Sequence, residues 1–215
     1  NTTSDLPRPA VRATISGKGL LAVSIWGASF VATRIALEWL TPFALVAARL
    51  WIGFAFLALL SGWRGGTLWP LRRDFIACGV LGAVLAAHLL MQATGLLYTS
   101  AINTGWIIGF FPVTIAIGAH LLRKQRLRPL GWLGVLLGTG GVSVVMMKAP
   151  PTFAQARWGD LLQLASCLTW TAYTLVGAGP VARNGALRIT TLSMGLAAVL
   201  VTVVTLAPHG GPYGG

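Results

Sequence analysis

The sequence predicts an all-α protein, a polytopic bundle of transmembrane helices, and three observations carry this prediction. The 215-residue chain is 55% hydrophobic and only 9% charged, with a mean hydropathy of +0.76, whereas a soluble domain carries about 25% charged residues. Its apolar residues gather in stretches of about 20, the length that crosses a bilayer as a helix. Its basic residues lie in short clusters between those stretches.

Seven apolar stretches have this length, and we expect each to form one membrane span. They cover residues 18–38, 41–63, 74–97, 101–122, 130–147, 159–179 and 187–207. The breaks between them are marked by Thr41 and Pro42, Gly65 and Gly66, Pro70, Pro129, Pro150 and Pro151, Pro180, and Pro208. Because proline lacks an N–H group and glycine is flexible, we expect the helices to begin or end at these breaks.

The distribution of lysine and arginine predicts the orientation. With alternating spans, twelve of the 16 basic residues fall on one side of the membrane: Arg8, Arg12, Lys18, Arg64, Arg72, Arg73, Arg123, Lys124, Arg126, Arg128, Arg183 and Arg188. The opposite side has only Lys148 and Arg157. Since cytoplasmic loops carry the excess of Lys and Arg, we expect the N-terminus in the cytoplasm. The net charge of +12 is thereby attributed to topology and lipid headgroups, so no nucleic-acid partner is expected.

The residue inventory argues against an enzyme, a metal centre or a cofactor site. Cys78 and Cys167 lie inside apolar stretches, without CxxC spacing or a neighbouring histidine, so neither a disulfide nor a metal site is indicated. The sequence contains no HExxH, GxSxG or P-loop motif and no pair of acids deep in a span. An unrecognised intramembrane enzyme stays open as a minor alternative.

Seven spans are also typical of receptors and rhodopsins. Those proteins place the N-terminus outside, and the seventh span here lacks a lysine that could hold retinal. A non-transporting seven-span receptor or membrane scaffold therefore remains the second hypothesis.

An internal repeat relates the first and sixth spans. Aligning Trp26 with Trp170 also pairs Leu20 with Leu164 at the same offset of 144 residues. Five spans separate the two copies, so the second copy enters the membrane from the opposite side. An odd-numbered unit repeated in tandem gives the inverted topology that recurs in secondary transporters.

A series of short segments, in order along residues 18–207, carries a family resemblance. The segments are Trp26-Gly27-Ala28-Ser29-Phe30, Arg34 to Leu37, Ala47 to Leu50, Ala93 to Ala101, Pro112, Leu130 to Val145, Trp158 to Leu162 and Leu168 to Tyr173. In these segments and their spacing the chain resembles the drug/metabolite transporter superfamily, EamA-like branch.

The resemblance implies ten spans arranged as two inverted repeats of five, and secondary transport of small organic metabolites, amino acids or drugs. It also implies export in many members, so we expect an efflux protein of a bacterial inner (plasma) membrane. The expected partners are a small-molecule substrate and the lipid bilayer, with a homodimer left open.

The chain departs from the family pattern in two ways. A Gly-Glu-Arg-Leu-like turn usually follows the fourth span, and here it reads Lys124-Gln125-Arg126-Leu127. The chain also has seven spans in place of ten, and the offset of 144 places the next span just beyond Gly215, so we expect a truncation there. The expected organisation is a cytoplasmic segment (1–17), the first repeat (18–148), an external loop (149–158), two spans of the second repeat (159–207) and a truncated external loop (208–215).

Two arginines lie inside predicted spans, where charge is costly and marks a candidate site. The hairpin joining the first two spans brings Arg34 and Arg49 to similar depths. One interpretation satisfies Arg34 with Glu38, one helical turn away, and with helix-end carbonyls, while Arg49 braces the bundle. The other is an anion site for a carboxylate or phosphate, for which the planar guanidinium is suited.

Three tryptophans lie deep in their spans, namely Trp26, Trp51 and Trp170. The other six, Trp39, Trp63, Trp69, Trp106, Trp132 and Trp158, lie near span ends and fit the interfacial belt. Because Trp26 and Trp170 are related by the repeat, they are candidates to line a central cavity and to stack against an aromatic substrate. Core packing is the alternative.

His88 lies midway through the third predicted span, and no carboxylate lies deep in any predicted span. His88 is the candidate for proton coupling, with a histidine hydrogen-bonded inside the bundle as the alternative. Asn103, Gln92 and Pro112 are expected to supply polar groups or unwound backbone around a site. The predicted substrate-binding set is Arg49, Arg34, Trp26, Trp170, His88 and Asn103.

Overall fold

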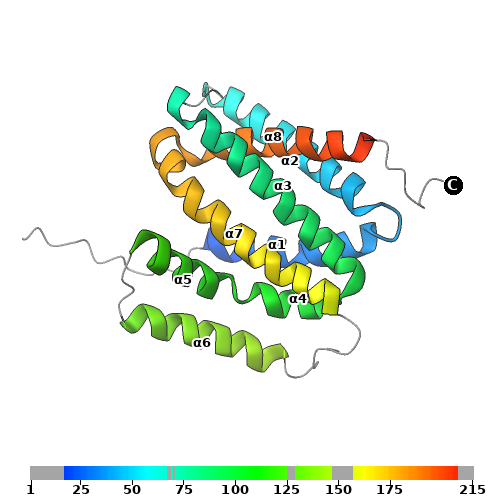
Figure 1. The fold of residues 1–215 in the computed structure, drawn as a ribbon, viewed down its shortest axis with the longest axis vertical. Coiled ribbons are helices and arrows are strands. Elements are labelled where there is room, and N and C mark those ends of the chain that lie inside the picture. Colours follow the sequence, from blue (N-terminus) through cyan, green and yellow to red (C-terminus); the bar gives the residue numbers. More distant parts are fainter. Residues whose placement is uncertain (1–16, 67–68, 70, 125–128, 147–156, 208–215) are drawn as a thin grey trace, which may run out of the picture.

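The computed structural model describes residues 17–66, 69, 71–124, 129–146 and 157–207. Its elements are α1 (Gly17–Ala36), α2 (Pro42–Trp63), the 3-10 helix η1 (Arg72–Asp74), α3 (Phe75–Tyr98), α4 (Ala101–Ile108), α5 (Phe111–Arg123), α6 (Pro129–Met146), α7 (Arg157–Asn184) and α8 (Ala186–Leu206). All regular elements in the described ranges are helices, which confirms the predicted all-α bundle (Figure 1).

Within the described residues, five segments are long and apolar enough to cross a membrane. They are Pro42–Trp63, Arg72–Tyr98, Ala101–Arg123, Trp158–Asn184 and Ala186–Leu206. A shorter apolar segment, Leu20–Ala36, lies in α1. Large apolar side chains on the outer faces of these helices are exposed, for example Leu59 (76% exposed) and Ile76 (82% exposed). Such surfaces suit lipid contact, so the chain is an integral membrane protein.

Local sequence explains where helices α2 and α4 begin. Thr41 caps α2 by accepting a hydrogen bond from the backbone N–H of Ala44 (3.3 Å), and Pro42 occupies the first turn. Ser100 caps α4 by accepting from the N–H of Asn103 (3.0 Å). These are the side chains that satisfy the unpaired N–H groups of a helix start.

The predicted fourth span, 101–122, is two helices rather than one. α4 ends at Ile108 and α5 begins at Phe111, so the backbone is interrupted at Gly109 and Phe110. Pro112 lies in the first turn of α5 and has no N–H to donate to the preceding turn. Gly109 and Phe110 keep right-handed helical φ and ψ angles, and the N–H of Gly109 still donates to the carbonyl of Gly105 (3.0 Å), so the backbone around Pro112 is not unwound as expected.

The predicted end of the sixth span before Pro180 is wrong, because α7 continues through Pro180 to Asn184. A proline inside a helix removes one backbone hydrogen bond, and tertiary contacts can hold the next turn in place. Here Asn184 donates to the carbonyl of Pro180 (3.0 Å) and Arg183 pairs with Asp74 of η1. The helix stops at Gly185, whose φ of +84° is readily adopted by glycine.

The antiparallel pair of α3 and α7 forms the centre of the bundle. The start of α3 lies beside the end of α7, and near its other end Gly95 packs against Gly159. A Cβ atom on Gly159 would lie 2.8 Å from the carbonyl oxygen of Gly95, so the two backbones touch. A buried apolar cluster joins α3 to α2 and α8 through Val46, Leu50, Leu85, Ala86, Ala93, Ala197, Ala198 and Val201.

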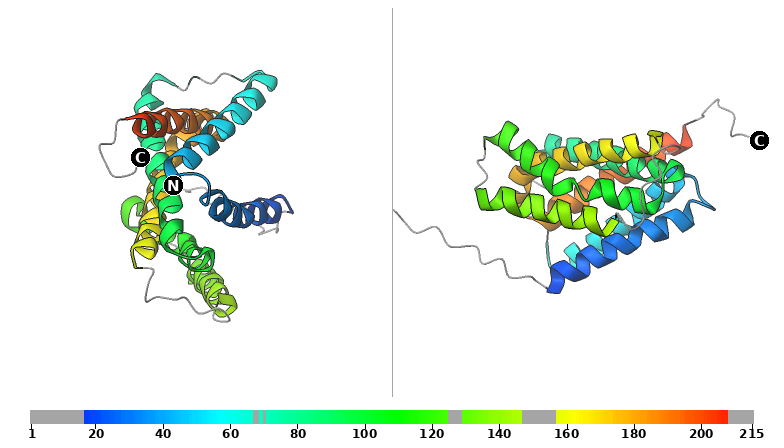
Figure 2. Two further views of the ribbon diagram at one scale, coloured as in Figure 1. Left: turned by 90° about the vertical axis from the view of Figure 1, so that its right-hand side faces the viewer. Right: turned by 90° about the horizontal axis from the view of Figure 1, so that it is seen from below.

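The remaining helices are arranged unevenly about this pair, with α2 and α8 against α3, and α4 and α5 against α7. Seen along the helices, α1, α2 and α6 project to the same side of α3 and α7 (Figure 2). α4 and α5 run parallel to α7, because Ile107 lies beside Cys167 and Thr114 beside Thr171. Small side chains permit the close packing of α5 on α7, where Gly118 faces Thr171.

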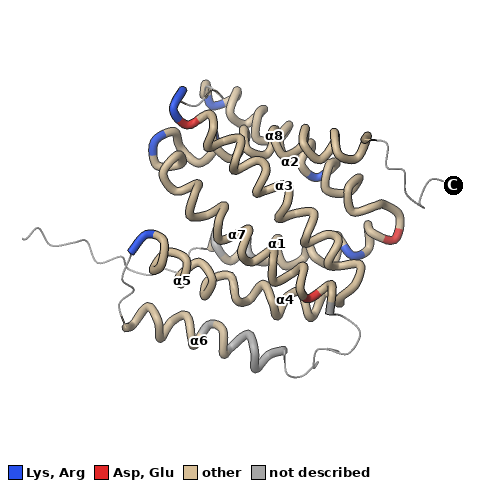
Figure 3. The backbone as a smooth tube through the Cα atoms, in the orientation of Figure 1, with Lys and Arg blue, Asp and Glu red and all other residues tan. Residues whose placement is uncertain are grey.

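Basic residues gather at one end of the bundle, as Figure 3 shows. The end of α2, the start of α3, the end of α5 and the junction of α7 with α8 meet there. Several positions used for the orientation lie outside the described residues: Arg8, Arg12, Arg126, Arg128 and Lys148. So do the variant turn at 125–127, most of the segment 1–17, most of the loop 149–158, and residues 208–215.

Candidate functional site

Four aromatic rings from four helices meet halfway along the bundle. This central aromatic cluster consists of Trp26 of α1, His88 of α3, Phe111 of α5 and Trp170 of α7. The ring centroid of Trp170 lies 6.2 Å from Trp26, 5.1 Å from His88 and 5.9 Å from Phe111. Trp26 and Phe111 are 5.7 Å apart. Trp26 and Trp170 are therefore direct neighbours, and Trp26 remains 39% exposed.

The third mid-span tryptophan has a different role. The indole N–H of Trp51 donates to the hydroxyl of Thr202 (3.0 Å) and so links α2 to α8. Depth in the span is the same for all three tryptophans, so depth alone does not identify the ones that share a site.

His88 is held in a fixed orientation, because it is 3% exposed and its Nδ1 lies 3.0 Å from the carbonyl oxygen of Ser166. The hydroxyl of Thr169 lies 3.2 Å from the same nitrogen. A carbonyl can only accept, so the neutral ring carries its proton on Nδ1 and its lone pair on Nε2. His88 therefore has the hydrogen bond inside the bundle that the alternative interpretation expects. Its Nε2 is the nitrogen that could take up a proton.

Three amide side chains are buried inside the bundle, namely Gln92 of α3, Asn103 of α4 and Gln163 of α7. Gln163 Nε2 donates to the backbone carbonyl of Gln92 (3.0 Å). Gln92 Nε2, Asn103 Nδ2 and Gln163 Oε1 are buried without a hydrogen-bond partner, as are Thr104 Oγ1 and Trp106 Nε1 in α4. Buried polar atoms are nearly always paired, so this concentration of unpaired atoms marks a polar site.

Gln163 is absent from the set predicted from sequence. The sequence could have identified Gln163, because it precedes Trp170 by seven residues and therefore lies on the same helix face. His88 contacts Ser166, between these two positions, which confirms that this face of α7 points to α3.

The two intramembrane arginines join α1 to its neighbours. The guanidinium of Arg34 donates to the carbonyl of Leu96 in the last turn of α3, where unpaired carbonyls carry partial negative charge. Arg49 Nη1 donates to the hydroxyl of Thr33 (2.9 Å). Arg34 therefore has one of its expected partners, a backbone carbonyl at a helix end. The expected pairing of Arg34 with Glu38 is not found, because α1 ends at Ala36 and Glu38 leaves the helical face.

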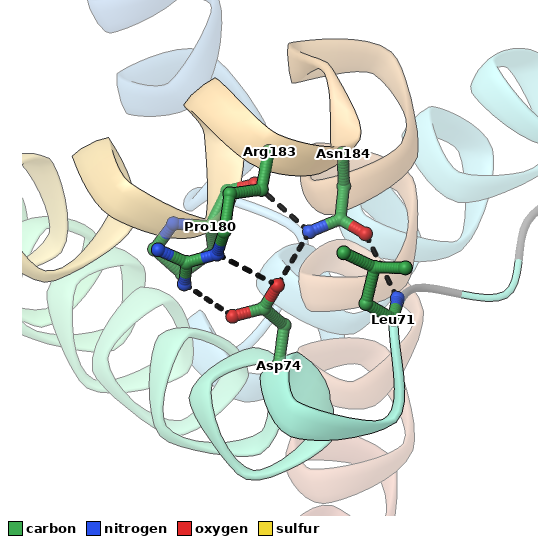
Figure 4. A network of polar contacts seen from close by, with 5 residues as sticks. All are labelled: Leu71, Asp74, Pro180, Arg183 and Asn184. Atoms are coloured by element: carbon green, nitrogen blue, oxygen red, sulfur yellow. Dashed lines mark hydrogen bonds and ion pairs between the residues drawn. The ribbon is translucent and has the colours of Figure 1, made fainter.

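A second polar network, missed by the sequence analysis, ties the start of α3 to the end of α7 (Figure 4). Arg183 pairs with Asp74, the one ion pair among the described residues, and its Nε lies 3.1 Å from Asp74 Oδ2. Asn184 donates to the same carboxylate oxygen (2.7 Å) and accepts from the backbone N–H of Leu71 (2.8 Å). At the other end of the pair, Thr99 donates to Asp160 (2.6 Å).

Comparisons with known proteins agree with this architecture. Residues 17–147 match the EamA-like transporter family. An uncharacterized transporter of Synechocystis is 31% identical over 195 residues, covering 88% of this chain and 56% of that protein. An uncharacterized transporter of Archaeoglobus fulgidus is 29% identical over 161 residues, covering 73% and 55%. A protein of Rhizobium johnstonii named riboflavin transporter is 28% identical over 174 residues, covering 74% and 53%.

No solved structure matches the chain. The chain spans about half the length of the curated relatives it matches. The family match covers more than half of the chain and includes α1 to α6, of which α1 to α5 contribute residues to the arrangement described above. The chain belongs to the EamA-like transporter family, a family of membrane transporters.

Proposed function

We propose that this membrane transporter exports a small organic molecule with an aromatic group from the cytoplasm, and that the substrate contacts the central aromatic cluster. The observation that carries the proposal is the contact between Trp26 and Trp170. Residues related by an inverted repeat meet near the pseudo-twofold axis, where the substrate sites of such transporters lie. Stacked indole and phenyl rings offer flat apolar surface to an aromatic substrate.

The helix boundaries support the inverted repeat itself. α2 begins at residue 42 and α8 at residue 186, the same offset of 144 that relates Trp26 to Trp170. α2 and α8 run antiparallel, since Trp51 lies beside Thr202 and Phe54 beside Gly195. We therefore propose residues 18–148 as the first repeat and 159–207 as the beginning of the second.

The charge distribution supports a cytoplasmic N-terminus in a bacterial inner membrane. The basic helix ends lie together at one end of the bundle, and Arg34 and Glu38 lie at the other end of α1. In this orientation Arg34 and Arg49 lie toward the outer side, where they would attract an anionic group of the substrate. His88 would couple transport to protons through Nε2, and Asn103 would add a hydrogen bond.

A transport assay on the full-length protein tests the proposal. We would reconstitute it into proteoliposomes and measure counterflow of labelled tryptophan, aromatic amines and riboflavin, the last because one relative is named for it. Trp26→Leu and Trp170→Leu should each lower counterflow at least tenfold per folded molecule. Trp51→Leu is the matched control, because Trp51 lies at similar depth outside the cluster, and it should retain transport.

Two results would contradict the proposal. Equal losses in all three tryptophan variants would remove the cluster as the substrate site. No counterflow of any compound by the unmodified protein would favour the receptor or scaffold hypothesis. Export itself is tested in cells, where expression should speed efflux of a preloaded substrate, and faster uptake with unchanged efflux would contradict it. Light scattering of the purified protein tests whether it forms a homodimer.

A further inference from the structure

The three buried amides offer a specific pattern of unpaired hydrogen-bonding atoms. Gln92 Nε2 and Asn103 Nδ2 are donors, whereas Gln163 Oε1 is an acceptor. The orientation of the Gln163 amide is determined by its own hydrogen bond, because only its nitrogen can donate to the Gln92 carbonyl. Each of the three side chains is more than nine-tenths buried.

Helix register brings the third amide to the other two. α4 runs parallel to α7, with Ile107 beside Cys167 and, just before α4, Thr99 beside Asp160. Asn103 is one helical turn before Ile107, and Gln163 is one turn before Cys167, so the two amides lie level on facing helices. Gln163 contacts Gln92 directly. The unpaired atoms of α3, α4 and α7 therefore face a common region.

This region adjoins the central aromatic cluster. Gln163 precedes Trp170 by seven residues on α7, about 10 Å along the axis at 1.5 Å per residue. Gln92 follows His88 by one turn on α3. A fused-ring molecule of two or three rings has this length, so one ligand can reach both the aromatic rings and the amides.

We infer that the three amides form a hydrogen-bonding subsite for the cyclic imide edge of a planar aromatic substrate. An imide presents two carbonyl oxygens flanking one N–H, which complements two amide donors and one amide acceptor. An uncharged edge fits this subsite because the three amides carry no net charge. A site whose buried polar groups stay unpaired without the right partner selects strongly for that partner. The inference rests on the proposed function and names its substrate class.

Binding of three tricyclic probes tests it without any substitution. Lumichrome carries the imide, N3-methyl-lumichrome has its imide N–H blocked, and phenazine lacks the imide. We would measure binding to the full-length protein in nanodiscs by equilibrium dialysis, with empty nanodiscs correcting for lipid partitioning. Lumichrome should bind at least tenfold more tightly than either other probe. Equal affinities for all three would overturn the subsite and leave the aromatic site standing. Failure of all three to bind would overturn the aromatic site as well.

Single substitutions test which amide supplies each hydrogen-bond donor or acceptor to the ligand. Gln163→Met keeps the side-chain length and removes the acceptor, so lumichrome and its N3-methyl derivative should bind equally, with phenazine unchanged. Asn103→Leu removes a donor to a carbonyl oxygen, so both carbonyl-bearing probes should weaken about equally. Thr191→Val is the control, because Thr191 is a buried polar residue of α8 bonded within its own helix. Retained discrimination in Gln163→Met would overturn the assignment.

Discussion

Arg183, near the end of α7, reaches across to the buried carboxylate of Asp74 at the start of α3. At the opposite end of the same helix pair, Thr99 donates to Asp160. Polar contacts thus join α3 to α7 at both ends, and the aromatic cluster and the amides lie between them. In the proposed function, a substrate bound at the aromatic cluster would lie between these two contacts. We expect each of these two contacts to affect the folding or the opening of the α3–α7 pair. Substitutions at each contact can be measured separately.

The first prediction concerns Asp74→Asn. The substitution removes the charge that Arg183 and Asn184 bind, and because Asp74 is buried its partners cannot be replaced by bulk water. We expect a lower melting temperature of the purified protein in detergent. Glu38→Gln is the control, since Glu38 is an exposed acid outside the one ion pair in the described part of the chain. An unchanged melting temperature for Asp74→Asn would contradict the prediction.

The second prediction tests the close approach of α3 and α7. In Gly159→Ala the new Cβ would lie 2.8 Å from the Gly95 carbonyl oxygen and from the Thr99 nitrogen, and backbone cannot rotate aside. Overpacking of this kind costs about 1–3 kcal/mol. Gly27→Ala is the matched control, because a Cβ there meets no atom within 4 Å. Thermal unfolding should separate the two variants, and equal stability would show that the helices can move apart freely.

The third prediction separates the two roles of Arg49. Arg49→Lys keeps the charge and loses the planar fork, so transport should fall at least tenfold per folded molecule if the guanidinium binds substrate. Thr33→Val removes the partner of Arg49 and keeps the arginine. It should lower the melting temperature with transport per folded molecule retained. If instead Arg49→Lys lowers stability and leaves transport intact, Arg49 is a brace between α1 and α2.

The fourth prediction concerns His88. In His88→Gln the amide can still donate to the Ser166 carbonyl, but it cannot take up a proton at neutral pH. We expect counterflow without a pH gradient to persist and accumulation driven by a pH gradient to be lost. His120→Gln, near the end of α5, should retain both activities. Gradient-driven accumulation by His88→Gln would remove His88 from the coupling mechanism.

The sequence by itself determined where most helices lie. A helix that crosses the bilayer needs a long apolar segment, and the first turn of a helix needs a capping side chain for its unpaired N–H groups. α2 follows Thr41 and Pro42 as expected, and the offset of 144 residues between Trp26 and Trp170 identified two members of the aromatic cluster. Pro112 accounts for the break at Gly109 and Phe110, which the sequence did not predict because residues 101–122 form one apolar stretch.

Only the tertiary structure decided which faces of the helices meet. Lipid is as apolar as a helix interface, so apolar residues surround each span and hydrophobic periodicity does not reveal the inner face. The partners of Gln163, the pairing of Arg34 with the end of α3, and the continuation of α7 past Pro180 all depend on side chains that are distant in sequence. Asp74 and Arg183 are 109 residues apart, and the ion pair forms because α3 and α7 pack antiparallel.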